Sequence, residues 1–351
     1  MKIDHVHFYV RDAIASRNWF VSKMGFQAMG SEGDRHTQTE VVAQGSICFR
    51  LSSPTSASGP VFEFLQQHPP GVVDVAFRVR DVAAVIERAI AQGATVLQPI
   101  RQSASGTSAQ IAAWGTLHHT LLEQFSDLRP CTPDPAVTEI DHVVLNVAVG
   151  ELEKAAAWYE TVFEFQPQQR FAIQTARSGL CSRVMQHPQS SVRLPINEPT
   201  SDSSQIQEFL ELNRGAGIQH IALHTPDIVK AIARFRKLGL SFLQVPLSYY
   251  TQLRQRPNRM LSETKFRQIQ AQELLVDWPP DQPEGILLQT FTQPIFECPT
   301  FFFEVIERQS YRVDDRLLQA QGFGEGNFRA LFEAMEQEQL KRAVAIATLI
   351  D

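Results

Sequence analysis

Three residues in the second half of the chain could together bind a metal ion: His142, His220 and Glu304. Two imidazoles and one carboxylate on one face of a metal leave its other positions open, which is the ligand set of non-haem Fe(II) oxygenases. The imidazoles suit a borderline metal, and the carboxylate neutralises part of its charge. The three residues are far apart in the sequence, so their spacing alone carries little weight. The prediction depends on how the chain repeats itself.

The elements that would position these residues occur twice. Three pairs of segments align between the two halves of the chain: DHVHFYV (4–10) with DHVVLNV (141–147), 74–98 with 220–244, and TLLEQF (120–125) with FFFEVI (301–306). In the second pair, a strand-like alternation leads to an aspartate at a helix N-cap position, Asp81 or Asp227. A glycine then follows where a helix should end, at Gly93 or Gly239. Each half therefore contains two βα-type modules, and the halves are related by duplication.

The two halves differ at one of the three candidate ligand positions. In this alignment, the counterparts of His142, His220 and Glu304 are His5, Asp74 and Glu123. Only the second half can therefore assemble two imidazoles and one carboxylate. We expect one metal ion per chain, bound in the second half.

The other histidines near these positions are interpreted as structural. His224 lies four residues after the second candidate ligand, which on a helix would suggest a zinc pair. The segment HIALHT is typical of a strand, however, where two such side chains would lie about 13 Å apart. His118 and His119 are adjacent, so their side chains must diverge on a strand. His5 and His7 belong to the half without a full triad and are interpreted as remnants or packing residues.

The length of 351 residues predicts two domains. The Pro-rich stretch RPCTPDP (129–135) is typical of a linker. We therefore expect an N-terminal domain without metal over 1–130 and a C-terminal catalytic domain over 137–351. Hydrophobic residues make up 43% of the chain and charged residues 20%, a composition that provides enough apolar material for two cores.

Charge and composition argue against several classes of protein. The net charge is −6 with no run of like charge, so we expect no nucleic-acid partner. No stretch approaches the ~18 consecutive apolar residues of a membrane span, and the chain begins without a charged-then-apolar leader. The four cysteines are dispersed and form no CxxC pair, which argues against disulfides and indicates a reducing cytoplasm.

Several motifs give the chain a resemblance to a known family. They are IDHVVLNV (140–147), LPINEP (194–199), SQIQEFLELNRGAGIQHIALHT (204–225), LLQTFT (287–292), FFFEVIER (301–308) and GFGEGNFRALFEAME (322–336). With them the chain resembles, over essentially its whole length, the 4-hydroxyphenylpyruvate dioxygenase family of the vicinal-oxygen-chelate superfamily. The resemblance implies an α+β, glyoxalase-like fold of duplicated, paired βαβββ modules. It also implies an open barrel-like sheet around the metal in the C-terminal domain.

The resemblance also implies a set of site residues, carried over position by position. The family's iron ligands fall on the triad named above, which implies one Fe(II) per chain. The residues that match catalytic positions near the phenol ring are Ser182, Asn197 and Gln205, and those near the metal are Gln219 and Gln289. The residues that match substrate-binding positions are Phe291, Phe323, Asn327 and Phe328.

The activity implied by the resemblance is conversion of 4-hydroxyphenylpyruvate and O2 to homogentisate and CO2, in tyrosine catabolism or prenylquinone precursor supply. A related enzyme, 4-hydroxymandelate synthase, uses the same substrate and triad, and the aromatic Phe328 favours the dioxygenase. An extradiol ring-cleaving dioxygenase and a non-catalytic binding protein of the same fold are further alternatives. The oligomeric state stays open, a homo-oligomer included.

The C-terminal residues are expected to control access to the metal. The spacing of apolar residues over 328–348 predicts an amphipathic helix, with a buried stripe of Leu331, Phe332, Met335 and Leu340. We expect this helix to act as a lid that excludes water from the iron. The region 247–284 is an insertion relative to the first half and is expected to border the mouth of the pocket.

Overall fold

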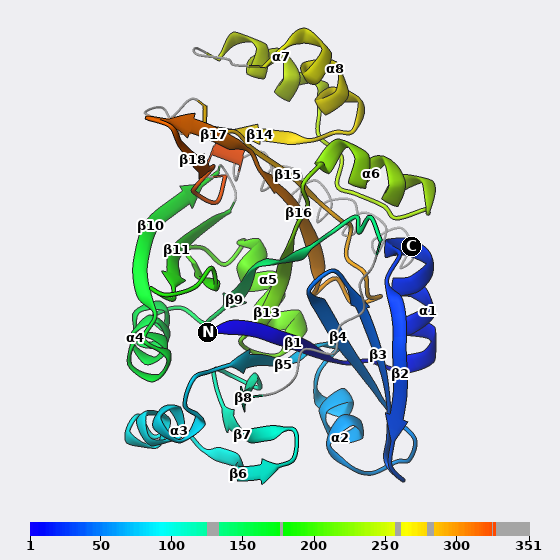
Figure 1. Ribbon diagram of the computed structural model, residues 1–351, viewed down its shortest axis with the longest axis vertical. Helices are drawn as coiled ribbons and strands as arrows, with labels where there is room; N and C mark the ends of the chain where they lie inside the picture. The colour runs from blue at the N-terminus through cyan, green and yellow to red at the C-terminus, as the bar shows by residue number, and fades with distance from the viewer. Residues whose placement is uncertain (125–132, 176–177, 257–260, 279–283, 325, 328–351) are drawn as a thin grey trace.

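The computed structural model describes residues 1–351 apart from 125–132, 176–177, 257–260, 279–283, 325 and 328–351 (Figure 1). The predicted lid helix over 328–348 and Phe328 lie outside the described residues, as does most of the predicted linker. The domain limits at 130 and 137 therefore stay a prediction.

The described residues of the first half form eight strands and three helices. The strands are β1 (Lys2–Tyr9), β2 (Gln27–Gly33), β3 (Thr37–Gln44), β4 (Ile47–Pro54), β5 (Gly71–Arg78), β6 (Val96–Ser103), β7 (Gly106–Ala112) and β8 (His118–Glu123). The helices are α1 (Ala13–Met24), α2 (Pro60–Gln67) and α3 (Val82–Ala91).

The described residues of the second half repeat this series and extend it. The strands are β9 (Glu139–Asn146), β10 (Gln166–Gln174), β11 (Gly179–Gln186), β12 (Arg193–Pro199), β13 (Gly217–His224), β14 (Leu275–Asp277), β15 (Leu287–Phe291), β16 (Phe302–Arg308), β17 (Ser310–Val313) and β18 (Arg316–Gln319). The helices are α4 (Leu152–Phe163), α5 (Gln205–Asn213), α6 (Ile228–Lys237), α7 (Leu247–Gln255) and α8 (Glu263–Ala271).

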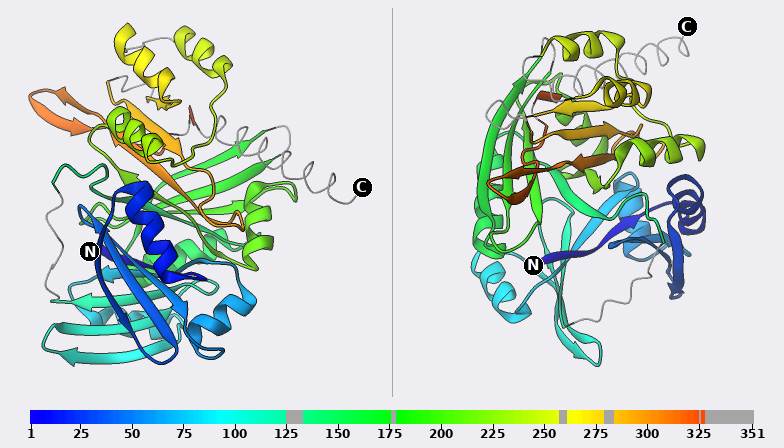
Figure 2. Two further views of the ribbon diagram at one scale, coloured as in Figure 1. Left: turned by 90° about the vertical axis from the view of Figure 1, so that its right-hand side faces the viewer. Right: turned by 45° about the horizontal axis from the view of Figure 1, so that its top comes forward.

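Each half forms one large sheet, and the two sheets have equivalent strand orders. The first sheet has the order β2-β3-β4-β1-β5-β8-β7-β6, and the second has β10-β11-β12-β9-β13-β16-β15-β14. The two central strands of each sheet are antiparallel, and each pairs in parallel with its outer neighbour. Both sheets curl into open half-barrels, with α1, α3, α4 and α6 on their outer sides (Figures 1 and 2). The predicted duplication of paired βαβββ modules is confirmed.

The helices begin where the sequence predicts. The side chain of Asp81 accepts a hydrogen bond from the Ala84 N–H at 2.9 Å, and Asp227 accepts one from the Lys230 N–H at 3.0 Å. The glycines that follow these helices, Gly93 and Gly239, have φ angles of +75° and +79°, which residues other than glycine rarely adopt. These caps fix where α3 and α6 leave the sheet.

The register of the outer strands corrects one predicted equivalence. Asp74 pairs with His118 and its counterpart His220 pairs with Phe302, so Glu304, two residues further on, is equivalent to Thr120. Glu123 is instead equivalent to Glu307. Both of these carboxylates accept the first N–H of an earlier helix: Glu123 from Val82 of α3 at 3.0 Å and Glu307 from Ile228 of α6 at 2.7 Å. The alignment of Glu123 with Glu304 was wrong by three residues because the segments are short and both carry a glutamate.

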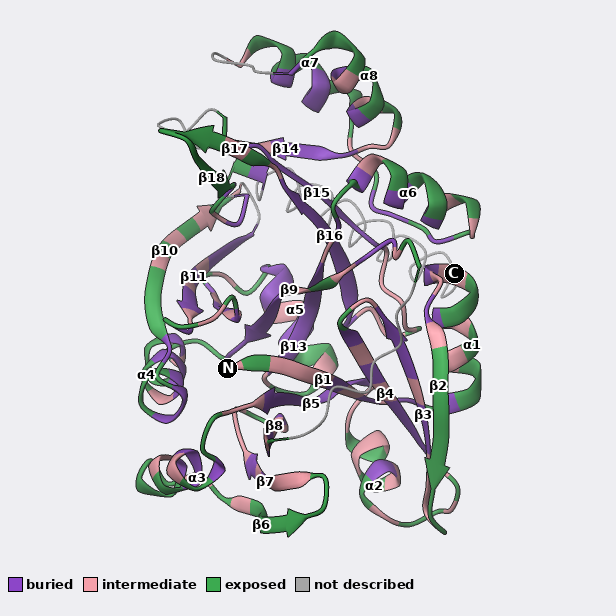
Figure 3. Cartoon of the chain, in the orientation of Figure 1, coloured by how far each residue is buried: buried purple, intermediate pink, exposed green. Residues whose placement is uncertain are grey.

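A single apolar core connects the two halves. Phe301, just before β16, and Phe303, near its start, pack against the first half. The ring centroids of Phe303 and Phe49 are 5.7 Å apart, and those of Phe301 and Phe8 are 5.1 Å apart. The strands β5, β9, β13 and β16 are buried over most of their length, while the edge strands β2 and β6 are exposed (Figure 3). The strand β16, which carries Glu304, is therefore fixed by its neighbours in the second sheet and by packing against the first half.

The predicted insertion forms α7, α8 and β14, of which only β14 has a counterpart in the first half. Its two helices bury Tyr249, Tyr250 and Phe266 at the β14 edge of the second sheet. Across the part of the chain that the structure describes, none of the helices has the length and apolar character needed to cross a membrane.

Candidate metal centre

The predicted triad comes together on three neighbouring strands. His142 is on β9, His220 on β13 and Glu304 on β16, and these strands are adjacent in the second sheet. One ligand atom from each residue lies within 4.8 Å of the others. The Nε2 atoms of His142 and His220 are 3.3 and 3.6 Å from the same atom, Oε2 of Glu304. The structure therefore brings together two imidazoles and one carboxylate as the repeat argument predicts.

The electrostatics of the triad fit a bound cation. Burial by itself raises the pKa of the Glu304 carboxyl, but the two imidazoles outweigh this effect and lower its pKa to about 2. Burial lowers the pKa of His220. Burial also acts to lower the pKa of His142, but Glu304 and Asp141 outweigh it and raise that pKa. An ionised carboxylate and a site that favours added positive charge are what a divalent metal requires.

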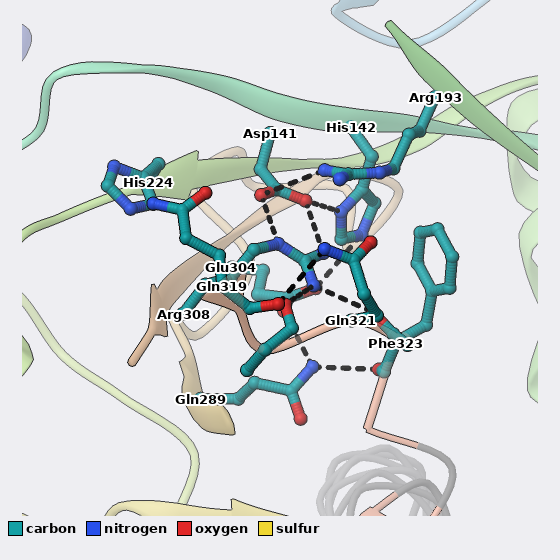
Figure 4. Close-up of polar contacts among 12 residues, drawn as sticks. Asp141, His142, Arg193, His224, Gln289, Glu304, Arg308, Gln319, Gln321 and Phe323 are labelled. Carbon is teal, nitrogen blue, oxygen red and sulfur yellow. Dashed lines mark hydrogen bonds and ion pairs between the residues drawn. The ribbon is translucent and has the colours of Figure 1, made fainter. Parts of the chain in front are cut away.

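A buried ion pair orients the first imidazole. The Nδ1 atom of His142 lies 2.9 Å from Oδ1 of Asp141, and both carboxylate oxygens of Asp141 accept from Arg308 at 2.7 Å (Figure 4). Arg193 approaches Oδ2 at 3.3 Å. Because Nδ1 donates to the carboxylate, Nε2 carries the lone pair and faces the centre of the triad. Arg308 is a functional residue that could not be predicted from the sequence, since no local pattern connects β16 to Asp141.

Arg308 also connects the triad to the segment after β18. Its Nη1 atom donates to the carbonyl oxygens of Ala320 at 3.2 Å and Gly322 at 2.8 Å. The ring of Phe323, next in the chain, packs against His142 with centroids 5.3 Å apart. The predicted site residue Phe323 is thus placed at the metal centre by contacts on both sides.

A pocket of about 480 Å³, counted together with the solvent space at its open mouth, lies beside the triad. It is lined by His142, His220 and the predicted residues Ser182, Asn197, Gln205, Gln219 and Phe323. Its other walls are mostly apolar and were missed by sequence analysis: Val144, Phe171, Ile173, Leu180, Pro195, Ile206 and Phe302. Their alternation along β10, β11 and β12 is a signal that could have identified them.

Three other predicted site residues lie outside the lining of this cavity. Phe291 packs against the rings of His220 and Phe302, at 6.5 and 6.2 Å. Gln289 donates to Oε1 of Glu304 at 2.9 Å, and Asn327 donates to Gln289. In this structure they support the triad rather than face the cavity. His224 bonds to Thr138 away from the triad, as its structural interpretation predicts.

The far wall of the cavity presents polar atoms that have no partner among the described residues. They include the Ser182 hydroxyl and Oε1 of Gln205, whose residues are fully or almost fully buried. Nearby, Asn197 donates to Oδ1 of Asn146 at 3.3 Å, and Nδ2 of Asn146 also lacks a partner there. Buried polar atoms are normally paired, so this wall is suited to a ligand with polar atoms of its own.

Comparisons with known proteins agree with this architecture. Residues 2–141 match the family described as hydroxyphenylpyruvate dioxygenase, N-terminal, and residues 139–256 match the glyoxalase/bleomycin resistance protein/dioxygenase superfamily. The 4-hydroxyphenylpyruvate dioxygenase of Yarrowia lipolytica is 34% identical, covering 97% of this chain and 92% of its own. That of Legionella pneumophila is 36% identical, covering 92% and 90%.

A solved structure shows the same fold. A triple mutant of 4-hydroxymandelate synthase from Streptomyces coelicolor superposes with a TM-score of 0.85 at 24% identity, covering 96% of this chain and 98% of that one. At this identity the likeness concerns the fold alone. The matches to curated relatives over almost the whole chain show more: the protein is a dioxygenase-type enzyme that belongs to the 4-hydroxyphenylpyruvate dioxygenase family.

Proposed function

We propose that the protein converts 4-hydroxyphenylpyruvate and O2 to homogentisate and CO2, with one Fe(II) held by His142, His220 and Glu304. The observation that carries the proposal is the buried triad beside a cavity with an apolar body and a polar far wall. When bound, Fe(II) would supply the redox chemistry and the open positions for a 2-oxo acid and O2.

The residues of the chain would bind the substrate at its two ends. A phenol hydroxyl at the far wall can hydrogen-bond with Ser182, Asn197 and Gln205, whose uncharged groups add no charge near the metal. The aromatic ring would lie between apolar walls that include Phe171 and Phe302. These walls exclude water, which strengthens each polar contact inside the cavity.

Near the metal, the protein would act by orienting its own side chains. Asp141 holds the imidazole of His142 with Nε2 toward the centre. Gln289 holds one oxygen of Glu304, which leaves the other toward the two imidazoles. Gln219 lines the cavity beside His220 and can hydrogen-bond with the oxo-acid end of the substrate.

The second candidate function is that of 4-hydroxymandelate synthase, because an enzyme with this activity has the same fold. The two activities differ in which carbon is hydroxylated, and we propose ring hydroxylation because position 328 is a phenylalanine. We also propose that the enzyme acts in the cytoplasm, since its cysteines are dispersed along the chain. A role in tyrosine catabolism or prenylquinone precursor supply is proposed from membership of the family.

The test is anaerobic loading with Fe(II) and 4-hydroxyphenylpyruvate, followed by air and product analysis by chromatography. Homogentisate as the main product supports the proposal. Hydroxymandelate as the main product would instead identify a synthase. Substrate binding without turnover, in protein shown to contain iron, would favour a non-catalytic binding protein.

A further inference from the structure

A chain of buried hydrogen bonds connects the insertion to the carboxylate of the triad. The Tyr249 hydroxyl donates its proton to Oδ1 of Asn327 at 3.0 Å, the nearer of two acceptors, since the Val276 carbonyl oxygen lies at 3.2 Å. Nδ2 of Asn327 donates to Oε1 of Gln289 at 3.0 Å. Nε2 of Gln289 then donates to Oε1 of Glu304 at 2.9 Å. All four residues are at most 7% exposed, so water does not compete for these bonds.

The direction of each bond follows from the one before it. The ionised Glu304 can only accept, so Gln289 must turn its NH2 group toward it and its Oε1 away. That Oε1 requires the NH2 group of Asn327, which leaves Oδ1 of Asn327 as an acceptor for Tyr249. The Tyr249 hydroxyl accepts in turn from the Val276 N–H at 2.7 Å. Burial raises the pKa of Tyr249 to about 12, so the hydroxyl keeps the proton that it donates.

We propose that Tyr249 is a positioning residue for the metal-binding carboxylate, acting through Asn327 and Gln289. It fixes the amide of Gln289, which occupies Oε1 of Glu304 and presents Oε2 alone to the metal. This inference rests on the proposed metal site and adds to it a residue 55 positions from Glu304 that contacts neither metal nor substrate.

The glycines of the 322–327 segment support this arrangement independently. A Cβ atom on Gly324 would collide with Oε1 of Gln289, and one on Gly326 would lie 2.5 Å from Oδ1 of Asp277. The Gly326 N–H also donates to Oδ2 of Asp277 at 3.0 Å. The segment can therefore approach Gln289 closely enough to place Asn327 only because it lacks side chains at these two positions.

The first half of the chain offers a natural contrast. The β7 position equivalent to Gln289 is Ser108, and the position equivalent to Glu304 is Thr120, so these two positions carry neither the amide nor the carboxylate of the second half. The helix α7 that carries Tyr249 also has no counterpart among the described residues of that half. The hydrogen-bond chain and the metal ligand are therefore present together in one half and absent together from the other.

The experiment compares Tyr249→Phe with Tyr250→Phe in the full-length protein. Tyr250 is the matched control, because it is buried in the same helix and its hydroxyl donates only to the Leu274 carbonyl, at 3.2 Å, among the bonds described. Co(II) is titrated anaerobically into each metal-free protein, and its absorption spectrum reports both affinity and ligand geometry. Melting temperatures show whether the two variants are equally stable.

We expect Tyr249→Phe to weaken Co(II) binding about 10-fold and to change the spectrum, as loss of an outer ligand contact does. Tyr250→Phe should stay within about twofold of the wild type. In a Gln289→Met background, Tyr249→Phe should have no further effect, since the connection is already broken.

Equal Co(II) affinities and spectra for the two phenylalanine variants would overturn the inference. So would an undiminished effect of Tyr249→Phe in the Gln289→Met background, because Tyr249 would then act by another route. A wild-type protein that takes up no Co(II) would overturn the metal site itself, a result distinct from either of these.

Discussion

The two halves of the chain share a strand order but differ in chemistry where their central strands meet. At the positions equivalent to His142, His220 and Glu304, the first half has His5, Asp74 and Thr120. There Asp74 accepts from the Thr120 N–H and the Gln110 amide, each at 2.9 Å, and from the Thr120 hydroxyl. The first half thus satisfies its carboxylate internally. The fold positions three side chains at this point, and their types decide whether a metal can bind.

One feature is common to both halves. The first strand of each half, β1 or β9, carries an Asp-His pair near its start, in which the carboxylate lies within 2.9 Å of the histidine Nδ1: Asp4 with His5, and Asp141 with His142. The arginine that pairs with the aspartate comes from β5 in the first half, as Arg78, and from β16 in the second, as Arg308. An Asp-His pair alone therefore does not indicate a metal site.

The largest effect is expected when the second half is made to resemble the first. Glu304→Thr reproduces the residue found at Thr120 and removes the carboxylate of the proposed triad. We expect loss of metal affinity beyond the roughly 10–100-fold that outer contacts cost, and loss of turnover. Calorimetric titration with Fe(II) under anaerobic conditions would measure it. Thr120→Ala is the control and should bind metal as the wild type does. Wild-type affinity in Glu304→Thr would show that Glu304 does not account for the difference between the two halves.

The Asp-His pairs should respond differently to the same substitution. Asp141→Asn removes the charge that orients His142 and neutralises Arg308, so we expect metal affinity to fall about 10–100-fold. Asp4→Asn alters the equivalent pair in the first half and should change metal affinity less than about twofold. If both variants bound metal equally well, the assignment of Asp141 as the group that orients His142 would be lost.

The pKa values of two buried histidines, His119 in the first half and His142 in the second, are shifted in opposite directions. Burial lowers the pKa of His119 from 6.5 to about 4, whereas carboxylates raise that of His142. Between pH 6.5 and pH 4 the histidine takes up a proton in the unfolded protein but not when it is buried in the folded protein. The neutral, buried His119 therefore contributes fully to the stability of the fold above pH 6.5, and this contribution is lost as the pH falls toward 4. The loss should reach about 3 kcal/mol of unfolding free energy.

Urea unfolding of metal-free protein between pH 7 and pH 4 would measure this dependence. His119→Gln keeps a hydrogen-bonding side chain toward Tyr159, which lies 2.9 Å from His119, but cannot titrate. The variant should lose stability less steeply than the wild type over this range. Identical slopes for the two proteins would show that His119 titrates normally in the folded state.

The smallest effect is expected where the halves are alike. Asp81→Ala and Asp227→Ala each remove a helix N-cap hydrogen bond, of 2.9 and 3.0 Å. Each should lower the unfolding free energy by about 1 kcal/mol and leave metal affinity unchanged. Thermal unfolding and metal titration of both variants would test this. A large difference between the two would mean that the helices are not equivalent in energy.

The duplicated fold and the triad could be predicted from sequence because both depend on local patterns. A strand pattern, an aspartate cap and a glycine recur at a constant offset, and this recurrence identified Asp74 as the odd counterpart of His220. The register of β8 against β5, and of β16 against β13, could not be predicted in the same way. Pairing between β5 and β8 depends on contacts across the sheet, and a glutamate three residues from Thr120 gave a false match.

The supports of the triad were not predictable for a related reason. Arg308 and Tyr249 act across contacts that join Asp141 to β16 and α7 to the 322–327 segment. No pattern within either segment indicates its partner. The polar atoms left without partners at Ser182 and Gln205 are likewise visible only once the strands are assembled. For such residues, sequence gives the type and the face of a strand but not the neighbour.

The most direct test of the account is the iron content of anaerobically loaded protein, measured by mass spectrometry per mole of chain. One iron per chain is expected in the wild type and in His5→Ala, and none should be retained in His142→Ala. Two equivalents in the wild type, or one equivalent retained by His142→Ala, would contradict a single metal centre in the second half.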